Sequence, residues 1–423
     1  MTRKLLICIP MLILLVTCKP GFKEVTWEYT DKDVVGVPPA KSDQINMDVY
    51  VDATTSMEGF AVSNASHYSQ FIDQLEASAL SAWRKADPAF FKFGQIIRPV
   101  DRTEFLSAKN NLTFYREKGV YLKTFIDSVV NRTDPKRLSV LVTDLFQDEG
   151  DVNIMVERFK EKCFARGVVV GIAGVKSDFK GKVYDVPNYP RGYDLDSKER
   201  PFYAIIFGNQ YNMELLFEAL KTKPFVKEEQ FLVFSNHIIK SYEAKLVKSA
   251  TSRSLVNKAQ RGIKNVFDFT LKKEGKETPR FNLEIMLNRN TRCADFSAKD
   301  IEPVVFKKSM KGTDKAAGDS STTSDISVTD LQRTGDKLTA TIVLNNEDEP
   351  GNFSYVIYLK ANQLNGLLTP KWIRDFSTDN PVPNTITAAK TYNLEKLSST
   401  LLVANATVSP TYIGKIYLNI YKR

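Results

Sequence analysis

Two short stretches of this chain place oxygen-bearing side chains directly after an apolar segment. One stretch supplies a carboxylate and two hydroxyls, and the other supplies a second carboxylate. Mg²⁺ prefers octahedral oxygen coordination and keeps several water ligands, so two hydroxyls and one or two carboxylates are enough from the protein. We therefore predict a site for Mg²⁺ or another divalent cation, formed by Asp52, Thr54, Ser56 and Asp144.

The apolar segments before these residues explain how the two stretches could meet. Residues 45–51 and 138–142 are typical of buried strands, and each ends at one of the acidic residues. In an open α/β sheet, ligands bind at the carboxyl ends of the strands, where strand order reverses. A simpler interpretation stays open, in which Asp52, Thr54 and Ser56 only cap the next helix and stabilise its turn.

Residues 45–240 alternate strand-like and helical segments, which predicts a doubly wound α/β domain. One helix is indicated by apolar residues at i, i+3, i+4, i+7 and i+11, with Ser63 or Asn64 as its cap. Further strands are expected at 89–100, 168–175, 202–207 and 231–234. The residues of the helical face are Tyr68, Phe71, Ile72, Leu75 and Ala79.

The rest of the chain has a different period. A polar, helix-prone linker is expected at 241–261, and from 262 to 423 apolar residues tend to alternate with polar ones. Several short alternating segments separated by turns predict an all-β, sandwich-like domain. We expect Trp372 to anchor a loop in the core of that sandwich.

The N-terminus has the features of a targeting signal. Arg3 and Lys4 precede a short apolar run, and the sequence up to Cys18 resembles a bacterial lipoprotein signal. This predicts a signal peptide at 1–17, lipidation of Cys18 and a tether at 18–44. The protein would then be anchored to a membrane of the bacterial cell envelope, either periplasmic or surface-exposed. An uncleaved anchor or an ordinary secretory signal is the alternative.

The two oxygen-bearing stretches resemble the first and last motifs of the von Willebrand factor A domain and its metal-ion-dependent adhesion site. The matching segments are Val51–Met57 and Val140–Asp144. The resemblance implies that Asp52, Thr54, Ser56 and Asp144 hold magnesium directly or through water. It also implies that an Asp or Glu of a protein partner completes the metal shell, in a role in adhesion or assembly.

One element of the family pattern is missing. The family contributes a further threonine from a loop, and the corresponding positions here are Gly119 and Val120, without a hydroxyl. Thr113 is a fallback candidate. The departure keeps a second hypothesis open, in which a degenerate site leaves a metal-independent structural or interaction lipoprotein.

Composition narrows the remaining classes. The chain has 423 residues and a net charge of +9, but its basic residues are scattered among acidic ones, so we expect no nucleic-acid partner. Only two histidines and four cysteines are present, which argues against zinc chemistry and histidine-based catalysis. We expect no enzyme activity; a metal-assisted hydrolase using Asp52 and Asp144 to activate water is the third hypothesis.

Overall fold

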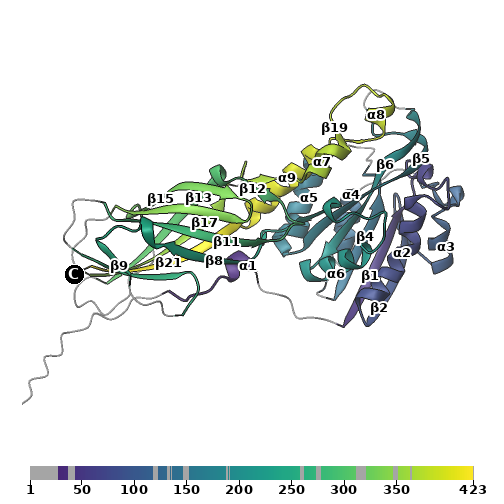
Figure 1. Cartoon of the computed structure of the whole chain (residues 1–423). Coiled ribbons are helices and arrows are strands. Elements are labelled where there is room, and N and C mark those ends of the chain that lie inside the picture. Colours follow the sequence, from purple (N-terminus) through teal and green to yellow (C-terminus); the bar gives the residue numbers. More distant parts are fainter. Residues whose placement is uncertain are drawn as a thin grey trace, which may run out of the picture.

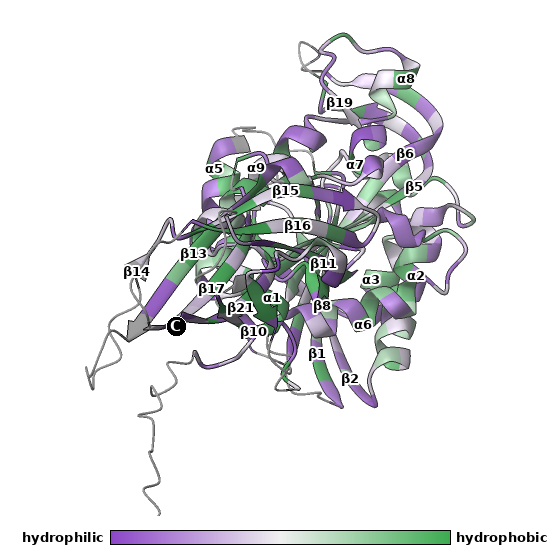
Figure 2. Cartoon of the chain, turned by 60° about the vertical axis from the view of Figure 1, so that its left-hand side comes forward, coloured by the Kyte–Doolittle hydropathy of each residue, from purple (hydrophilic) through white to green (hydrophobic). Residues whose placement is uncertain are grey.

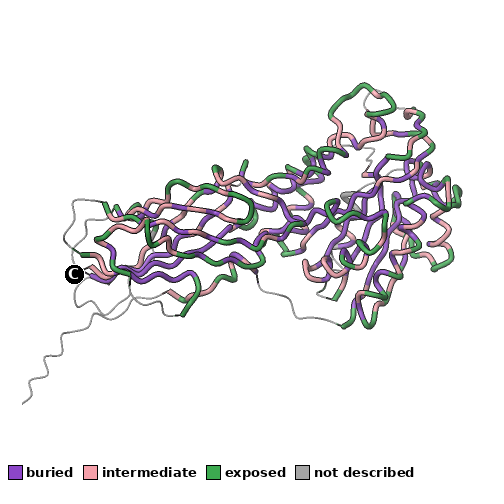
Figure 3. The backbone as a smooth tube through the Cα atoms, in the orientation of Figure 1, coloured by how far each residue is buried: buried purple, intermediate pink, exposed green. Residues whose placement is uncertain are grey.

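The computed structural model describes residues 27–36, 43–117, 122–130, 134, 136–145, 152–186, 189, 191–257, 262–272, 278–310, 321–345, 351–362 and 364–422. The predicted signal peptide and Cys18 lie outside these residues. The described chain forms an elongated molecule with two parts (Figure 1). We call them the seven-stranded sheet region and the two-sheet body. Buried residues run through the strands of both parts (Figure 3).

The seven-stranded sheet is mixed, with the order β3-β2-β1-β4-β6-β5-β7. Only β1 with β2 and β1 with β4 are parallel pairs. The pairs β2–β3, β4–β6, β5–β6 and β5–β7 are antiparallel. The strands are β1 (Gln44–Asp52), β2 (Lys85–Phe93), β3 (Ile97–Val100), β4 (Arg137–Thr143), β5 (Val169–Val183), β6 (Tyr193–Gly208) and β7 (Phe231–Phe234).

The prediction of a doubly wound α/β domain is therefore wrong. Strands β5 and β6 are consecutive strands that pair as a long antiparallel hairpin, and the described residues between them form no helix. A parallel pair needs a long crossover, usually a helix, whereas an antiparallel pair needs only a short connection. The expected single strand at 89–100 is likewise parts of two antiparallel strands, β2 and β3. An apolar run predicts that a strand is present, but it does not determine whether that strand runs parallel or antiparallel to its neighbours.

Helices cover both faces of this sheet. On one face, α2 (His67–Ala82) packs beside α6 (Gln210–Leu220). The predicted apolar face of α2 is confirmed, because all five residues of its predicted stripe are buried. The helix begins later than expected, since its N-cap is Ser66, whose side chain accepts a hydrogen bond from the Ser69 N–H at 3.1 Å. The same region holds α3 (Arg102–Ser107), α4 (Leu122–Val130) and α5 (Val152–Arg158).

The two-sheet body contains a six-stranded sheet, β14-β13-β17-β21-β10-β9, and a four-stranded sheet, β15-β16-β11-β8. Their inner faces share one apolar core. In β16 every second residue is buried, which is the period of a strand with one covered face. The strands are β8 (Ile239–Val247), β9 (Leu255–Asn257), β10 (Val266–Leu271), β11 (Arg280–Arg289), β13 (Ile301–Met310), β14 (Ser321–Thr322), β15 (Ile326–Thr334), β16 (Lys337–Leu344), β17 (Gly351–Ala361) and β21 (Tyr412–Lys422).

Two expectations about this part are corrected. The expected helix-prone linker at 241–261 overlaps β8, an edge strand of the four-stranded sheet that begins at Ile239. The region from 262 to 423 is not all-β, because it includes α7 (Lys371–Phe376), α8 (Thr385–Ala388) and α9 (Leu394–Val408). These helices extend from the body to the seven-stranded sheet region, where α7 and α9 cover the second face together with α4 and α5 (Figure 1). Two short strand pairs, β12 (Asp295–Phe296) with β18 (Leu367–Leu368) and β19 (Ser377–Thr378) with β20 (Thr391–Tyr392), accompany them.

Trp372 shows why the all-β prediction failed. The side chain lies not in the two-sheet body but against β5, where a Cβ built on Gly174 would come within 2.6 Å of the indole. Only a glycine leaves room for such a close approach. The strands on either side of 371–408 have period 2, which favours strands throughout, whereas this segment includes helices that pack on elements distant in sequence.

Residues 27–36 also depart from expectation. They were expected to belong to the tether, but they lie along β21 of the two-sheet body and include the short helix α1 (Lys32–Val35). Val34 is fully buried there. Figure 2 shows hydrophobic residues concentrated in the strands of both parts and at α1. We call residues 27–36 the strap.

Candidate functional site

The four residues of the predicted cation site lie together at the ends of β1 and β4. Thr54 donates from its hydroxyl to Asp52 Oδ1 at 2.7 Å, and the hydroxyls of Thr54 and Ser56 are 3.1 Å apart. Ser56 donates to Asp144 Oδ1 at 3.2 Å across 88 residues of sequence. All four residues are at most 4% exposed. The two stretches therefore meet, and their side-chain oxygens form one continuous series of hydrogen bonds. We call Asp52, Thr54, Ser56 and Asp144 the oxygen cluster.

Its backbone positions follow from the parallel pairing of β1 and β4. Val51 lies opposite Val142, so the two strands reach the same edge of the sheet before Asp52 and Asp144. Thr143 donates from its hydroxyl to Asp52 Oδ2 at 2.8 Å and accepts from the Leu145 N–H at 3.1 Å. Leu145 has φ of +66°, in the left-handed region that a leucine rarely adopts. The chain therefore turns sharply after Asp144, and Thr143 ties that turn to Asp52.

Arg200, on β6, is a member of the site that the sequence analysis missed. Its guanidinium Nη2 lies 3.8 Å from Asp144 Oδ2 and 3.0 Å from Asp185 Oδ1, and the residue is fully buried. Nη1 donates to the Ala388 carbonyl at 2.7 Å, which ties β6 to α8. A signal was present, because the period of a strand places position 200 on the same face as the buried residues at 202, 204 and 206.

The site holds more negative than positive charge. Asp144 and Asp185 both lie beside the Arg200 guanidinium, and Asp52 is linked to Asp144 through the hydroxyls of Thr54 and Ser56. These four charged groups carry two negative charges in excess when ionised (three minus one). Burial, together with the charge of Asp144, raises the pKa of Asp52 to about 7, although hydrogen bonds from Thr54 and Thr143 oppose the shift. A proton or a cation at this point would relieve the excess.

Two tyrosines stand near the cluster. Tyr68 of α2 and Tyr115 share a hydrogen bond of 2.7 Å between their hydroxyls. Burial raises the pKa of both phenols, and the carboxylate of Asp52 adds to the shift in each. Neither phenol ionises at neutral pH, so both provide neutral dipoles beside the carboxylates.

The loop expected to supply the missing threonine approaches the cluster through Glu117. The Glu117 N–H donates to the Ala53 carbonyl at 3.1 Å, next to Thr54. Gly94 makes room for this loop, since a Cβ there would come within 2.4 Å of the Glu117 Cβ. Gly119 and Val120 lie outside the described residues. Thr113 is exposed and donates to Asn111 at 2.7 Å, so it is no part of the oxygen cluster as described.

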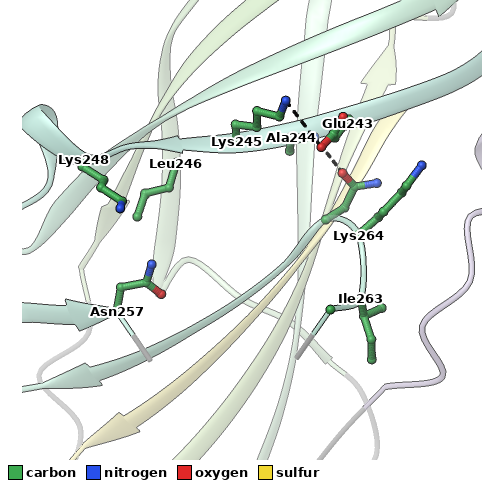
Figure 4. Close-up of a pocket in the computed structure, with 10 residues that line it drawn as sticks. Glu243, Ala244, Lys245, Leu246, Lys248, Asn257, Ile263 and Lys264 are labelled. Carbon is green, nitrogen blue, oxygen red and sulfur yellow. Dashed lines mark hydrogen bonds and ion pairs between the residues drawn. The ribbon is translucent and has the colours of Figure 1, made fainter. Parts of the chain in front are cut away.

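A second feature is a groove in the two-sheet body, of about 770 Å³, between β8 and the residues before β10 (Figure 4). Its lining includes three lysines, Lys245, Lys248 and Lys264. Lys245 lies 3.6 Å from Glu243, whereas the described residues offer no acidic partner to the other two. The three lysines give this groove a positive lining that would attract an anion, whereas the oxygen cluster is acidic.

The described residues contain no group of three or more His, Cys, Asp or Glu side chains able to hold a metal. The oxygen cluster has only two such residues, since its other two donors are hydroxyls. No described helix is both long and apolar enough to span a membrane. Comparison of the chain with protein-family models, with curated proteins and with solved structures found no match.

Proposed function

We propose that this chain is a bacterial envelope lipoprotein, anchored through Cys18, that binds a divalent cation at the oxygen cluster. In this proposal Thr54 and Ser56 bind the ion, while Asp52 and Asp144 balance its charge and orient its water ligands. A carboxylate of a protein partner completes the shell. The observation that carries the proposal is the meeting of two carboxylates and two hydroxyls from two distant segments in one buried cluster.

The donor set suits a hard cation such as Mg²⁺ in type and in spacing. Neighbouring ligands of an octahedral Mg²⁺ with bonds of 2.0–2.1 Å are about 2.9 Å apart. The successive oxygens of the cluster are separated by 2.7, 3.1 and 3.2 Å. These separations are also those of ordinary hydrogen bonds. A cation that replaced the hydrogen bonds between these oxygens would therefore require little movement of the side chains. The excess of negative charge favours that exchange.

The anchor and the partner are supported by the sequence. The apolar run that ends before Cys18 supports lipidation, and the resemblance of Val51–Met57 and Val140–Asp144 to the A domain supports a partner carboxylate at the metal. No chemical turnover is part of this proposal, since the cation supplies affinity rather than an activated water.

Titration with Mg²⁺ and Mn²⁺ tests the cation site. Calorimetry and thermal unfolding of the mature protein should both report binding, because an ion that binds only the folded state stabilises it by about 2.7 kcal/mol at a hundredfold excess over Kd. Asp52→Asn and Asp144→Asn should each remove the effect. Asp73→Asn is the matched control, since Asp73 is an exposed carboxylate paired with Lys109. No binding to the unaltered protein, or equal binding to Asp52→Asn, would exclude the cation.

Arg200 favours a second candidate, a metal-independent interaction protein. Its guanidinium already gives Asp144 and Asp185 a buried positive partner. On this hypothesis the cluster is a structural network that holds β1, β4 and β6 together, and a partner binds elsewhere on the molecule. The two candidates differ in one result: cations leave the melting temperature unchanged in the second and raise it in the first.

A further inference from the structure

The strap is bound to the two-sheet body by a series of specific contacts. The Tyr29 hydroxyl accepts a hydrogen bond from Asn419 Nδ2 at 3.0 Å, and the rings of Tyr29 and Tyr417 meet edge to face with centroids 5.0 Å apart. The Tyr417 hydroxyl donates to the Thr30 carbonyl at 2.8 Å and accepts from the Thr30 N–H at 3.1 Å. These partners are nearly 390 residues apart in sequence, so the strap is a tertiary element.

A charged contact and an aromatic contact extend the series. Lys415 Nζ lies 2.9 Å from Asp33 Oδ2, with the lysine side chain only 6% exposed. At the other end of the strap, Lys308 Nζ lies 4.3 Å from the centre of the Trp27 ring. These two contacts hold the strap to the body at residues 27 and 33.

The order of the contacts gives the strap a direction. As the strap runs from residue 29 to residue 33, its partners on β21 run from Asn419 to Lys415. A Cβ on Gly36 would then lie within 3.0 Å of the His237 ring, where β7 gives way to β8 between the two parts of the molecule. The strap thus points toward the seven-stranded sheet region, and its N-terminal end lies on the body.

This direction limits where a lipid on Cys18 can be. Nine peptide units separate Cys18 from Trp27, and an extended chain of that length spans at most about 32 Å. The oxygen cluster belongs to the other part of the molecule, beyond the end of the strap (Figure 1). An anchor at Cys18 therefore keeps the body near the bilayer and leaves the cluster on the distant part.

The lysine groove lies beside the strap. Asn265, which lines the groove, accepts from the Ala244 N–H through its side chain at 2.7 Å and from the Tyr417 N–H through its carbonyl at 2.9 Å. Tyr417 is also the main contact of the strap. The labelled side chains of Lys248 and Lys264 border the groove in Figure 4. Lysines near an anionic membrane surface are attracted to its headgroups.

We propose that the strap fixes the orientation of the protein on its membrane, with the two-sheet body and its lysine groove against anionic lipid headgroups and the oxygen cluster directed away from the bilayer. This inference rests on the lipid anchor of the proposed function.

Fluorescence quenching on vesicles tests the orientation with the full lipidated chain. One variant, Arg280→Cys, carries a fluorophore at the start of β11 in the body, and another, Ile96→Cys, carries it between β2 and β3. Both positions are exposed, whereas Cys163 and Cys293 are buried and escape labelling. With a quencher on the headgroups of mixed phosphatidylglycerol and phosphatidylcholine vesicles, the label at 280 should be quenched several-fold more than the label at 96.

Mass spectrometry of the N-terminal peptide shows whether Cys18 carries a lipid, and so distinguishes a failure of the anchor from a failure of the orientation. A lipid mass on Cys18 with equal or reversed quenching would overturn the orientation and leave the anchor standing. An unmodified Cys18 would overturn the anchor, and the orientation with it. Neither result bears on cation binding, which is measured separately.

Charge variants test the headgroup contact. Replacing Lys248 and Lys264 by Gln should lower the quenching at position 280 by about twofold on anionic vesicles and leave it unchanged on pure phosphatidylcholine. The control replaces Lys180 and Lys198, two exposed lysines of the β5–β6 hairpin, and should change neither. Equal effects of the two double variants would overturn the assignment of the groove. A strap variant, Tyr417→Phe with Lys415→Met, should reduce the difference between the two label positions on both kinds of vesicle.

Discussion

Buried charge is handled in opposite ways in the two parts of the molecule. In the two-sheet body, Lys415 has Asp33, and Asp268 accepts from Asn419 Nδ2 at 2.7 Å. The Asn419 side chain in turn accepts from Ser354 at 2.6 Å. In the seven-stranded sheet region, Asp52 and Asp144 share one buried cluster with two hydroxyls, and the Arg200 guanidinium is shared between Asp144 and a third carboxylate, Asp185.

The difference separates a structural network from a site prepared for a ligand. A buried charge that is paired with one opposite charge, as Lys415 is with Asp33, stabilises one conformation without a ligand. A buried cluster with surplus negative charge is held together at a cost, which a bound cation reduces. We therefore expect variants in the body to be insensitive to divalent cations, and variants at the oxygen cluster to respond to them.

The largest effect is expected from Arg200→Met. The change leaves Asp144 and Asp185 buried without their cation, so the free energy of unfolding should fall by about 3–5 kcal/mol in chelator. Mg²⁺ should restore part of the loss on the cation hypothesis. Urea unfolding with and without Mg²⁺ measures both quantities. Arg102→Met is the control, because Arg102 is 63% exposed and its pair with Glu76 is worth at most about 1 kcal/mol. A loss in Arg200→Met no larger than in the control would contradict the role given to Arg200.

The pH dependence of stability is the next largest effect. The pKa of Asp52 is about 7 in the folded protein and 3.8 in the reference state, so the folded chain holds the proton more tightly between these values. Its contribution to stability is complete below about pH 4 and is lost as pH rises through 7. One proton gives a slope of at most about 1.4 kcal/mol per pH unit.

The contribution of Asp52 to the pH dependence of stability can be isolated by comparing the unaltered protein with two Asn variants. In chelator, the unaltered protein should lose stability between pH 4 and 7 relative to Asp52→Asn, which cannot ionise. Asp73→Asn should follow the unaltered protein, since that carboxylate is exposed. Urea midpoints at several pH values provide the measurement, and parallel curves for the unaltered protein and Asp52→Asn would show that Asp52 does not carry the surplus charge.

Lys415→Met tests the other side of the comparison. The change breaks the pair with Asp33, whose side chain is 33% exposed and can be partly hydrated, so the cost should be about 1–3 kcal/mol. The loss should be the same with and without Mg²⁺, because Lys415 belongs to the body. Thermal unfolding in both conditions measures it, and Lys337→Met, which removes an exposed pair with Glu284, is the control. Rescue of Lys415→Met by Mg²⁺ would break the distinction between the two parts.

The sequence predicted local features better than global ones. The apolar stripe of α2 and the meeting of Asp52 with Asp144 follow from short-range periods and from the ends of two parallel strands. Strand direction did not follow, because β5 and β6 have the same apolar pattern whether they run parallel or antiparallel. The direction depends on the connection between them, and here the two strands form an antiparallel hairpin whose connection is short.

Long-range packing was outside the reach of local patterns. Trp372 packs against Gly174 and Tyr29 against Tyr417, and neither pair has a signal within a window of neighbouring residues. Arg200 lies between these two cases, since its burial follows from a local pattern and its ion pairs do not. The strand period places Arg200 on the same face as buried residues, but its contact with Asp185 depends on the antiparallel pairing of β5 with β6. Charge compensation within the candidate site therefore required the fold.

The smallest effect distinguishes two threonines. Thr54→Val removes a hydroxyl that donates to Asp52 and lies 3.1 Å from Ser56, so it should cost about 1 kcal/mol in chelator. Thr113→Val removes an exposed hydroxyl that bonds Asn111, and its effect should stay within about 0.5 kcal/mol. Both variants keep a β-branched side chain of similar volume, so the comparison isolates the hydroxyl. Mg²⁺ titration followed by thermal unfolding adds the decisive contrast: Thr54→Val should weaken the stabilisation by the ion, and Thr113→Val should not. If Thr113→Val weakened it equally, Thr113 would be the missing threonine of the adhesion-site pattern, and the loop that carries it would have to move to the oxygen cluster when the cation binds.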